Sequence, residues 1–102
     1  MRSLRSVLLG ALLISLALSN IAFAQSGADV FKTKCAACHG PDGKKEMPAM
    51  GVKSLASPDI QKKSDDELIA SVSKGKGKMP AYAGKLTDDQ IKQVVAYVKT
   101  LK

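Results

Sequence analysis

The sequence is poor in the large side chains from which small domains usually build a core. Among its 102 residues there is no tryptophan, and aromatic residues make up only 4% of the chain. Beyond position 24 the aromatic residues are Phe31, Tyr82 and Tyr97. Chains of this size bury only about 60% of their unfolded surface and commonly need a disulfide, a metal or another staple. The shortage therefore predicts that something large and flat, other than a side chain, fills the centre.

Long apolar runs are missing after the first 24 residues. Within those residues two arginines precede the almost continuously apolar stretch Val7 to Leu18, and Ala22-Phe23-Ala24 ends the segment with small residues around a cleavage site. This order is typical of a secretory signal peptide. The apolar run is shorter than the roughly 20 residues that span a bilayer, which disfavours an uncleaved membrane anchor. We therefore expect residues 1–24 to be removed, and residues 25–102 to form one soluble domain without a membrane span, most simply in a bacterial periplasm.

Arginine is also absent after the first 24 residues. The formal charge of +7 falls to about +5 when Arg2 and Arg5 are removed, and the excess rests on lysine. Nucleic-acid binding is disfavoured because arginine and aromatic residues for base recognition are scarce and because export separates the protein from nucleic acid. A charge far from zero keeps a small protein monomeric and attracts acidic partners. We expect a monomer that docks to acidic protein surfaces.

No segment alternates polar and apolar residues between turn signals, so the sequence predicts no β-hairpin. Capping patterns instead predict three helices. They are Ser26-Gly27-Ala28-Asp29, Ser64-Asp65-Asp66-Glu67 and Thr87-Asp88-Asp89-Gln90. Apolar residues at helical spacing follow each pattern, and the last series continues to Leu101. Gly75 is the expected end of the second helix, and Ser57-Pro58 predicts one further short turn. The predicted fold is all-α, with three main helices joined by long loops.

All of the cysteine and histidine in the chain lies in Cys35-Ala36-Ala37-Cys38-His39. This C-x-x-C-H pattern is the attachment signature of c-type haem. Two thiols three residues apart can each form a thioether with one haem vinyl group, and the histidine that follows can ligate the iron. A structural zinc site needs four cysteine or histidine ligands, which this chain lacks. A redox dithiol belongs to a βαβ context that is not predicted here, and a disulfide across so short a loop would add little stability.

Because His39 is the single histidine, the iron needs a different ligand on its other face or keeps an open position. The candidates are Met47, Met50 and Met79, each of which could alternatively be core filler. Met47 and Met50 follow His39 by eight and eleven residues, too few for the chain to pass around a flat disc. Met79 follows by forty residues, in the loop KGKGKMPAY. We therefore expect a His39/Met79 pair, the ligation that raises the reduction potential of haem iron.

Three stretches resemble the class I cytochromes c, close to their small single-haem periplasmic and photosynthetic members. They are CAACHG with Gly27 and Phe31 before it, the loop KGKGKMPAY, and the ending TDDQIKQVVAYVKTL. The resemblance covers Ser26 to Lys102 and implies a small cytochrome c fold around one covalent haem c. It implies that Cys35 and Cys38 carry the thioethers, with His39 and Met79 as axial ligands of the iron.

The same resemblance assigns roles outside the ligand set. It implies that Gly27 and Phe31 cross the terminal helix near Tyr97. It also implies that the Pro48 carbonyl accepts a hydrogen bond from His39 and orients its ring. Leu55 and Tyr82 resemble positions that pack on the haem, and plain core packing is an equally good interpretation of both.

These observations predict an electron carrier and not an enzyme, since iron with two protein ligands has no vacant site for a substrate. Four lysines flank the loop of Met79 and are expected to steer acidic redox partners, namely Lys74, Lys76, Lys78 and Lys85. One alternative is a haem subunit or accessory domain of a larger oxidoreductase. A second is a haem enzyme with an open distal position, for which the chain offers no second histidine as acid or base.

Overall fold

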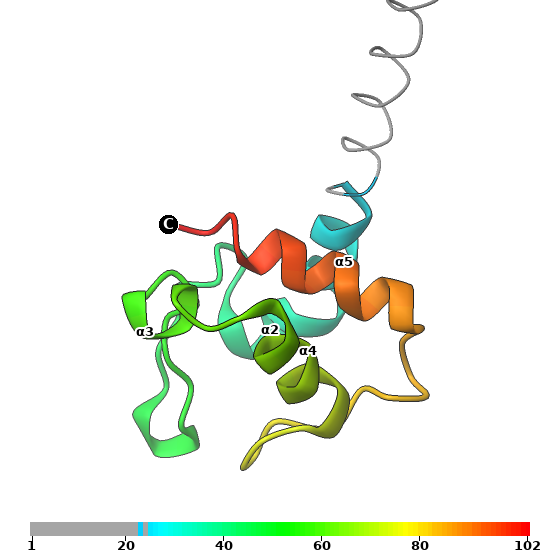
Figure 1. Cartoon of the computed structure of the whole chain (residues 1–102). Coiled ribbons are helices and arrows are strands. Elements are labelled where there is room, and N and C mark those ends of the chain that lie inside the picture. The colour runs from blue at the N-terminus through cyan, green and yellow to red at the C-terminus, as the bar shows by residue number, and fades with distance from the viewer. Residues whose placement is uncertain (1–22, 24) are drawn as a thin grey trace, which may run out of the picture.

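The computed structural model describes residue 23 and residues 25–102 (Figure 1). The predicted signal peptide, apart from Phe23, lies outside these described residues. Among the described residues, no helix combines the length and the apolar character that crossing a membrane requires.

The described part of the chain is helical, as predicted, and contains no β-strand, only isolated β-bridges. Residues 25–30 are α-helical and run directly into the π-helix η1 and then α2. The remaining elements are the 3₁₀-helix η2 and the helices α3, α4 and α5. Their bounds are η1 Phe31–Cys35, α2 Ala36–His39, η2 Pro48–Met50, α3 Pro58–Gln61, α4 Asp65–Lys74 and α5 Asp88–Val98.

The first helix differs from the prediction at its start and in its middle. Residue 25 is already helical, so Ser26 lies inside the helix and is not the N-cap that the pattern indicated. In η1 the N–H of Ala36 bonds to the carbonyl of Phe31, five residues back. A π-turn holds one residue more than an α-turn and frequently occurs at functional sites. Here it ends at Cys35, the first residue of the C-x-x-C-H segment, and sets the rotation of that segment relative to Phe31.

Helices α4 and α5 begin at the predicted caps. The Ser64 hydroxyl accepts a hydrogen bond from the N–H of Glu67 at 3.2 Å. At α5 the capping box is complete, because the Thr87 hydroxyl accepts from the N–H of Gln90 at 3.1 Å and the Gln90 side chain accepts from the N–H of Thr87 at 2.9 Å. The two helices pack against each other. Gly75 ends α4 with φ +74°, as the sequence predicted.

Helix α5 ends three residues earlier than predicted. It stops at Val98, and the chain turns there because the N–H groups of Thr100 and Leu101 bond to the carbonyls of Tyr97 and Val98 at 2.9 and 3.1 Å. Leu101 leaves the helical stripe and covers Gly43, whose absent Cβ would lie 2.6 Å from the Leu101 Cδ1. The last apolar residue of the chain thus closes over the loop that follows the cysteines.

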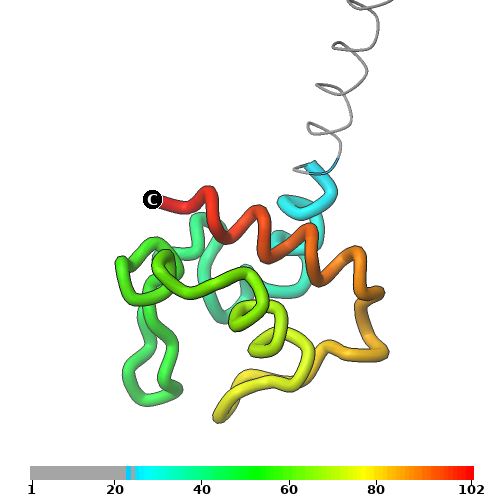
Figure 2. The backbone as a smooth tube through the Cα atoms, viewed as in Figure 1, coloured from blue at the N-terminus to red at the C-terminus, as the bar shows by residue number. Residues whose placement is uncertain are grey.

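The core lies where the first helix crosses α5. Phe31, Ile91 and Val94 are each 1% exposed, and the rings of Phe31 and Tyr97 lie 5.3 Å apart. A Cβ on Gly27 would overlap the carbonyl oxygen of Gln93 and lie 3.1 Å from the Tyr97 Cβ. The predicted close crossing at Gly27 is therefore confirmed, and it brings the first helix against α5, which lies near the end of the chain in sequence (Figure 2).

Candidate haem site

A cavity of about 510 Å³ occupies the space enclosed by the helices and the long loops. Its volume falls in the range of roughly 300–1,000 Å³ that is usual for sites of compact organic ligands and cofactors. All four residues predicted to hold haem, Cys35, Cys38, His39 and Met79, line this cavity. The structure therefore brings together side chains that lie as much as 44 residues apart in the chain.

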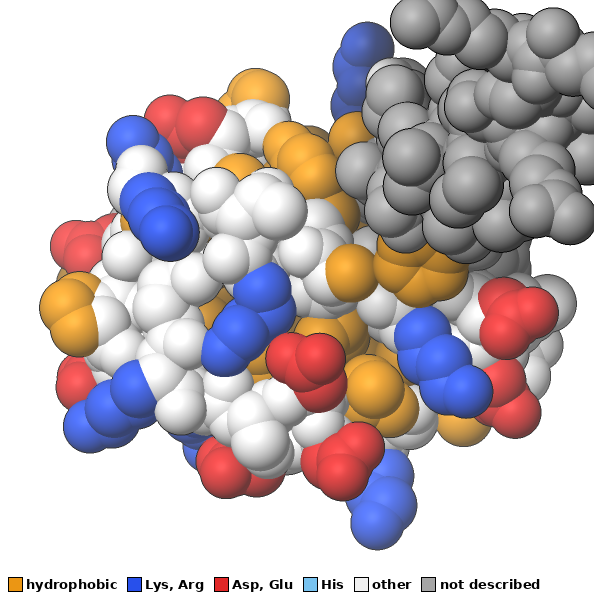
Figure 3. Space-filling model, turned by 45° about the horizontal axis from the view of Figure 1, so that its top comes forward, with side chains coloured by type: hydrophobic (Ala, Val, Ile, Leu, Met, Phe, Trp, Pro, Cys, Tyr) orange, Lys and Arg blue, Asp and Glu red, His pale blue; other side chains and the backbone are white. Residues whose placement is uncertain are grey.

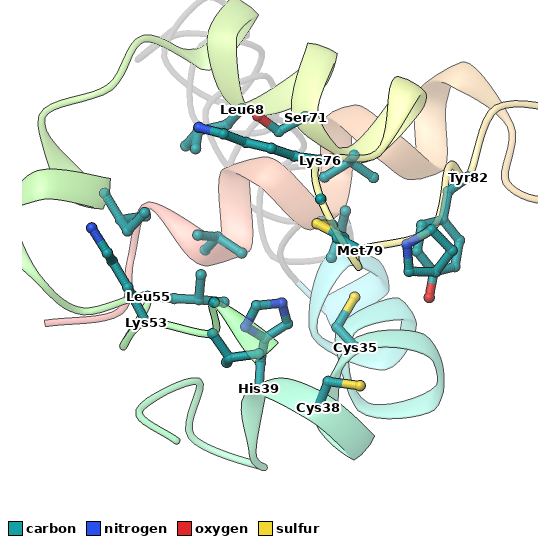
Figure 4. Close-up of a pocket in the computed structure, with 18 of the residues that line it drawn as sticks. Cys35, Cys38, His39, Lys53, Leu55, Leu68, Ser71, Lys76, Met79 and Tyr82 are labelled. Carbon is teal, nitrogen blue, oxygen red and sulfur yellow. The ribbon is translucent and has the colours of Figure 1, made fainter. Parts of the chain in front are cut away.

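Figure 4 shows how these side chains lie around the cavity. The imidazole of His39 points into it from α2, and Met79 lies across from it on the loop that follows α4. The sulfur atoms of Cys35 and Cys38 lie beside the His39 ring, on successive turns of the first helix. The arrangement offers one imidazole and one thioether from facing sides, together with two thiols along one edge.

The walls of the cavity are largely apolar. Helix α4 contributes Leu68 and Val72, and helix α5 contributes Val94, Val95 and Val98. These are the apolar faces that the helical spacing predicted, and in this fold they surround the cavity as well as each other. Such walls suit a flat aromatic ring, since burial of apolar surface is worth about 25 cal/mol per Å².

The ring of His39 is half-buried, and its Nδ1 atom is buried without a hydrogen-bond partner among the described residues. The predicted hydrogen bond to the Pro48 carbonyl is not formed. That carbonyl accepts from the N–H of Gly51 at 3.1 Å, because Pro48 begins the tight turn of η2. Burial lowers the pKa of His39, so the imidazole is neutral at pH 7 and has a lone pair for a metal.

The thiol of Cys35 differs from those of redox pairs. Burial, with a smaller effect of Cys38, raises the pKa of Cys35 to about 11. Redox-active cysteines in C-x-x-C motifs instead have a lowered pKa, because the thiolate is their reactive form. The environment of Cys35 thus disfavours the dithiol alternative.

The loop that carries Met79 is closed on itself. The N–H of Met79 bonds to the carbonyl of Lys76 at 3.0 Å, and the N–H of Lys76 bonds to the carbonyl of Met79 at 3.2 Å. Gly75 packs against this turn, since its Cβ would lie 2.5 Å from the Met79 carbonyl oxygen. A glycine is required at residue 75 both for this approach and for its positive φ.

The other two candidate methionines lie in the loop around η2. Met50 lines the cavity but is 43% exposed, and Met47 is not among the lining residues. Met47 pairs with Val52 through backbone hydrogen bonds of 3.0 and 3.1 Å, which close the η2 turn. This loop and the Met79 loop project to the same side of the molecule (Figure 2), and Lys78 Nζ reaches the Ala49 carbonyl at 3.4 Å.

Sequence reasoning missed two side chains that fix the walls. The amide nitrogen of Gln61 donates to the carbonyls of Leu55 and Val98, at 2.7 and 2.9 Å. Lys99 Nζ donates to the carbonyls of Gln61 and Lys63, both at 2.6 Å. Together these bonds join α3 to the end of α5. Side-chain bonds to distant backbone carbonyls leave no periodic pattern in a sequence, so no signal could have indicated them.

Positive charge surrounds the opening of the cavity. The lysines flanking the Met79 loop are all exposed, and Lys76 and Lys78 also line the cavity. Lys53 and Lys63 line it as well. Elsewhere the charges are mixed, since lysines and acidic side chains are interspersed on the face shown in Figure 3. Within residues 25–102 the ion pair formed is Lys62 with Asp59, at 3.6 Å.

Comparisons with known proteins agree with this geometry. The family described as cytochrome C oxidase, cbb3-type, subunit III matches residues 22–98. The cytochrome c6 of Parathermosynechococcus lividus is 45% identical over 73 residues, covering 72% of this chain and 84% of that protein. The cytochrome c6 of a Nostoc species is 41% identical over 98 residues, covering 90% and 86%. Among solved structures, the KustC0563 c-type cytochrome superposes with a TM-score of 0.69 at 29% identity, covering 74% of this chain and 96% of that one.

Proposed function

The chain belongs to the cytochrome c family, and from this premise we propose that it is a soluble electron carrier with one haem c. In this proposal Cys35 and Cys38 hold the haem through thioether bonds, and His39 and Met79 are the axial ligands of its iron. The single observation that carries the proposal is that these four side chains line one apolar cavity, with His39 and Met79 facing each other.

The residues present fit this cofactor. The cavity has apolar walls for a porphyrin ring, two thiols at one edge, and a buried neutral imidazole. The exposed Lys53 and the partly buried Lys63 also line the cavity and offer cationic groups that could neutralise the carboxylates of haem. When bound, haem would supply one-electron exchange at iron. The protein would hold both axial positions, exclude water through α4 and α5, and favour the ferrous state through the thioether.

The environment also supports a carrier over an enzyme. With His39 and Met79 as ligands, no position at the iron would remain for a substrate. The acidic residue that lines the cavity is Asp59, and its exposed carboxylate pairs with Lys62 at 3.6 Å. A proton-transfer catalyst would need an acid or base aimed at the reacting atoms.

We further propose that residues 1–24 are a signal peptide and that the carrier works in the periplasm as a monomer. The order of charged, apolar and small residues at the start of the chain supports this. The exposed lysines 74, 76, 78 and 85 would steer acidic redox partners toward the cavity. Haem attachment after export would complete the core that the few aromatic residues leave unfilled.

A second candidate function is that of a haem subunit in a larger oxidoreductase. The description of the matched family, a subunit of an oxidase, favours it. The cytochromes c6 favour the carrier, since they match this chain over 84% and 86% of their own length. The native mass of the protein purified from its source separates the two, because a carrier elutes as a monomer and a subunit elutes with its partners.

The direct test of the carrier proposal is spectroscopic and electrochemical. The purified protein is expected to retain haem after denaturation, to show the weak far-red band of an iron–thioether bond when oxidised, and to titrate as a reversible one-electron couple. The mass is expected to correspond to residues 25–102 plus one haem. Two results would contradict the proposal. One is a haem that can be extracted with acid and organic solvent, and the other is ferrous iron that binds carbon monoxide rapidly, as an open position would allow.

A further inference from the structure

We propose that the hydroxyl of Tyr82 is a positioning group that holds the Met79 loop against the haem-attachment helix. This inference rests on the proposed ligation by His39 and Met79. It assigns Tyr82 a role beyond contact with the cofactor, namely keeping the thioether in place.

The geometry of Tyr82 joins two segments that are far apart in the chain. Its hydroxyl donates a hydrogen bond to the carbonyl of Lys34 at 3.1 Å, across 48 residues. Lys34 directly precedes Cys35, and Tyr82 follows Met79 by three residues. Figure 4 shows Tyr82 beside Met79, with its hydroxyl directed toward the helix that carries Cys35. The bond therefore links the proposed distal ligand to the helix that carries the proposed proximal ligand.

The other hydrogen bonds of the Met79 loop do not make this link. The turn between Lys76 and Met79 is internal to the loop, and the N–H of Tyr82 bonds to the Val72 carbonyl of α4 at 2.9 Å. Lys78 reaches the η2 loop, in an exposed contact of 3.4 Å. Among hydrogen bonds between described residues, that of the Tyr82 hydroxyl is the one that ties residues 75–86 to the helix of residues 25–39.

The surroundings of the phenol keep it available as a donor. Burial raises the pKa of Tyr82, so the hydroxyl stays protonated at neutral pH. The ammonium group of Lys85 lies over the ring, 5.9 Å from its centre. The ring also lines the cavity, so it would pack against a bound haem.

Removing this hydroxyl should ease opening of the loop without emptying the site. Local opening and global unfolding are separate equilibria, and the loss of one hydrogen bond shifts the equilibrium that breaks it. An open loop would withdraw the Met79 thioether from the iron, so that an added ligand could bind in its place. We therefore expect Tyr82→Phe to raise the affinity of the ferric protein for imidazole by about three- to tenfold.

The experiment compares the haem-loaded wild type, Tyr82→Phe and Tyr97→Phe. Tyr97 is the matched control, because its ring packs on Phe31 and its hydroxyl forms no hydrogen bond within residues 25–102. Each ferric protein is titrated with imidazole while the iron–thioether band is recorded, and each is also melted thermally. We expect only Tyr82→Phe to bind imidazole more tightly, with the band intact before imidazole is added.

Three results would overturn the inference. Equal imidazole affinities of wild type and Tyr82→Phe would do so, including the case in which Tyr82→Phe lowers only the melting temperature, since that is a purely structural role. An equal effect of Tyr97→Phe would show that any lost hydroxyl suffices. A wild type without the iron–thioether band would overturn the proposed ligation together with this inference, and so would be distinguishable from failure of the Tyr82 role alone.

Discussion

His39 and Met79 face each other across one cavity although forty residues separate them in the chain. His39 is carried by the end of the first helix, and Met79 by a turn that closes on itself beyond α4. Neither segment alone could supply ligands to both faces of a flat cofactor. The pair therefore depends on the packing that sets the first helix and α4 on either side of the cavity.

Replacing Met79 by alanine should remove the distal ligand and leave the haem attached. We expect loss of the iron–thioether band and a fall in the reduction potential on the order of 0.1 V, a fraction of the roughly 0.8 V span over which axial ligands tune haem. Met50→Ala is the control, since Met50 is 43% exposed at the edge of the cavity. Met47→Ala is a second control. Retention of the band in Met79→Ala, or its loss in either control, would contradict the assignment.

Replacing Gly27 by alanine should destabilise the protein, although alanine favours helices. The added Cβ would overlap the carbonyl oxygen of Gln93, so α5 must shift to admit it. We expect a loss of about 1–3 kcal/mol in the free energy of unfolding, as for other overpacked sites, measured by denaturant titration. Lys32→Ala, at an exposed position of the same helix, should stay within about 0.5 kcal/mol of the wild type. Equal stability of both variants would show that the crossing of the two helices can accommodate a methyl group at residue 27.

Replacing Gln61 by alanine should loosen the wall formed by α3. The variant loses the bonds of 2.7 and 2.9 Å to the carbonyls of Leu55 and Val98, and the Leu55 carbonyl is left unpaired while that of Val98 keeps the N–H of Leu101 at 3.1 Å. We expect a loss of about 2–3 kcal/mol in the free energy of unfolding. Gln25→Ala is the matched control, because Gln25 forms one exposed bond of 3.3 Å to Asp29. A similar loss in both variants would argue against a special role for Gln61.

The stability of the protein should fall as the pH drops below about 6.5. Burial lowers the pKa of His39 from 6.5 in the folded state, and iron bound to the ring would lower it further, so the unfolded chain binds the proton more tightly. The stabilisation is fully present above pH 6.5 and is lost as the pH falls toward the folded-state pKa. Denaturant midpoints at about pH 7.5, 6 and 5 would measure this before the carboxylates titrate near pH 4. A midpoint that rises on acidification would contradict the expected sign.

The association of the protein with an acidic redox partner should slow as salt is added. At about 0.15 M ionic strength the Debye length is only about 8 Å, so long-range attraction to the exposed lysines is screened. The triple variant Lys74→Gln, Lys76→Gln and Lys78→Gln should show a smaller slope of rate against salt. Lys32→Gln, outside the cavity lining, should keep most of the slope. An equal slope in all proteins would rule out steering by this loop.

Local chemistry made a large part of the fold predictable. The caps at Ser64 and Thr87 depend on residues three positions apart, and the helix end at Gly75 depends on the φ of that residue. Each feature is therefore determined by a few neighbouring residues of the sequence. The crossing at Gly27 was anticipated through the family resemblance and is confirmed. The same locality explains an error at Ser26, because whether a capping pattern starts a helix depends on the residues before it.

What escaped prediction depends on contacts between distant segments. The π-turn of residues 31–35 has no distinctive composition, and the early end of α5 follows from Leu101 packing over Gly43. The side chains of Gln61 and Tyr82 bond to backbone carbonyls 37 and 48 positions away. Every residue has a backbone carbonyl, so the sequence does not indicate which one is the partner. Motif spacing identified the residues of the candidate site, while the side chains that hold its walls had to be seen in three dimensions.

The contact between Gly27 and Gln93 has a consequence for how the molecule assembles. It closes a loop of 66 residues, so forming it carries the entropic cost of bringing two distant segments together, a cost that grows with loop length. A large apolar ring attached at residues 35 and 38 would touch both α4 and α5 and so shorten that search. The cofactor would then act as a folding template as well as a redox centre, and a chain that never receives it should remain open to proteases.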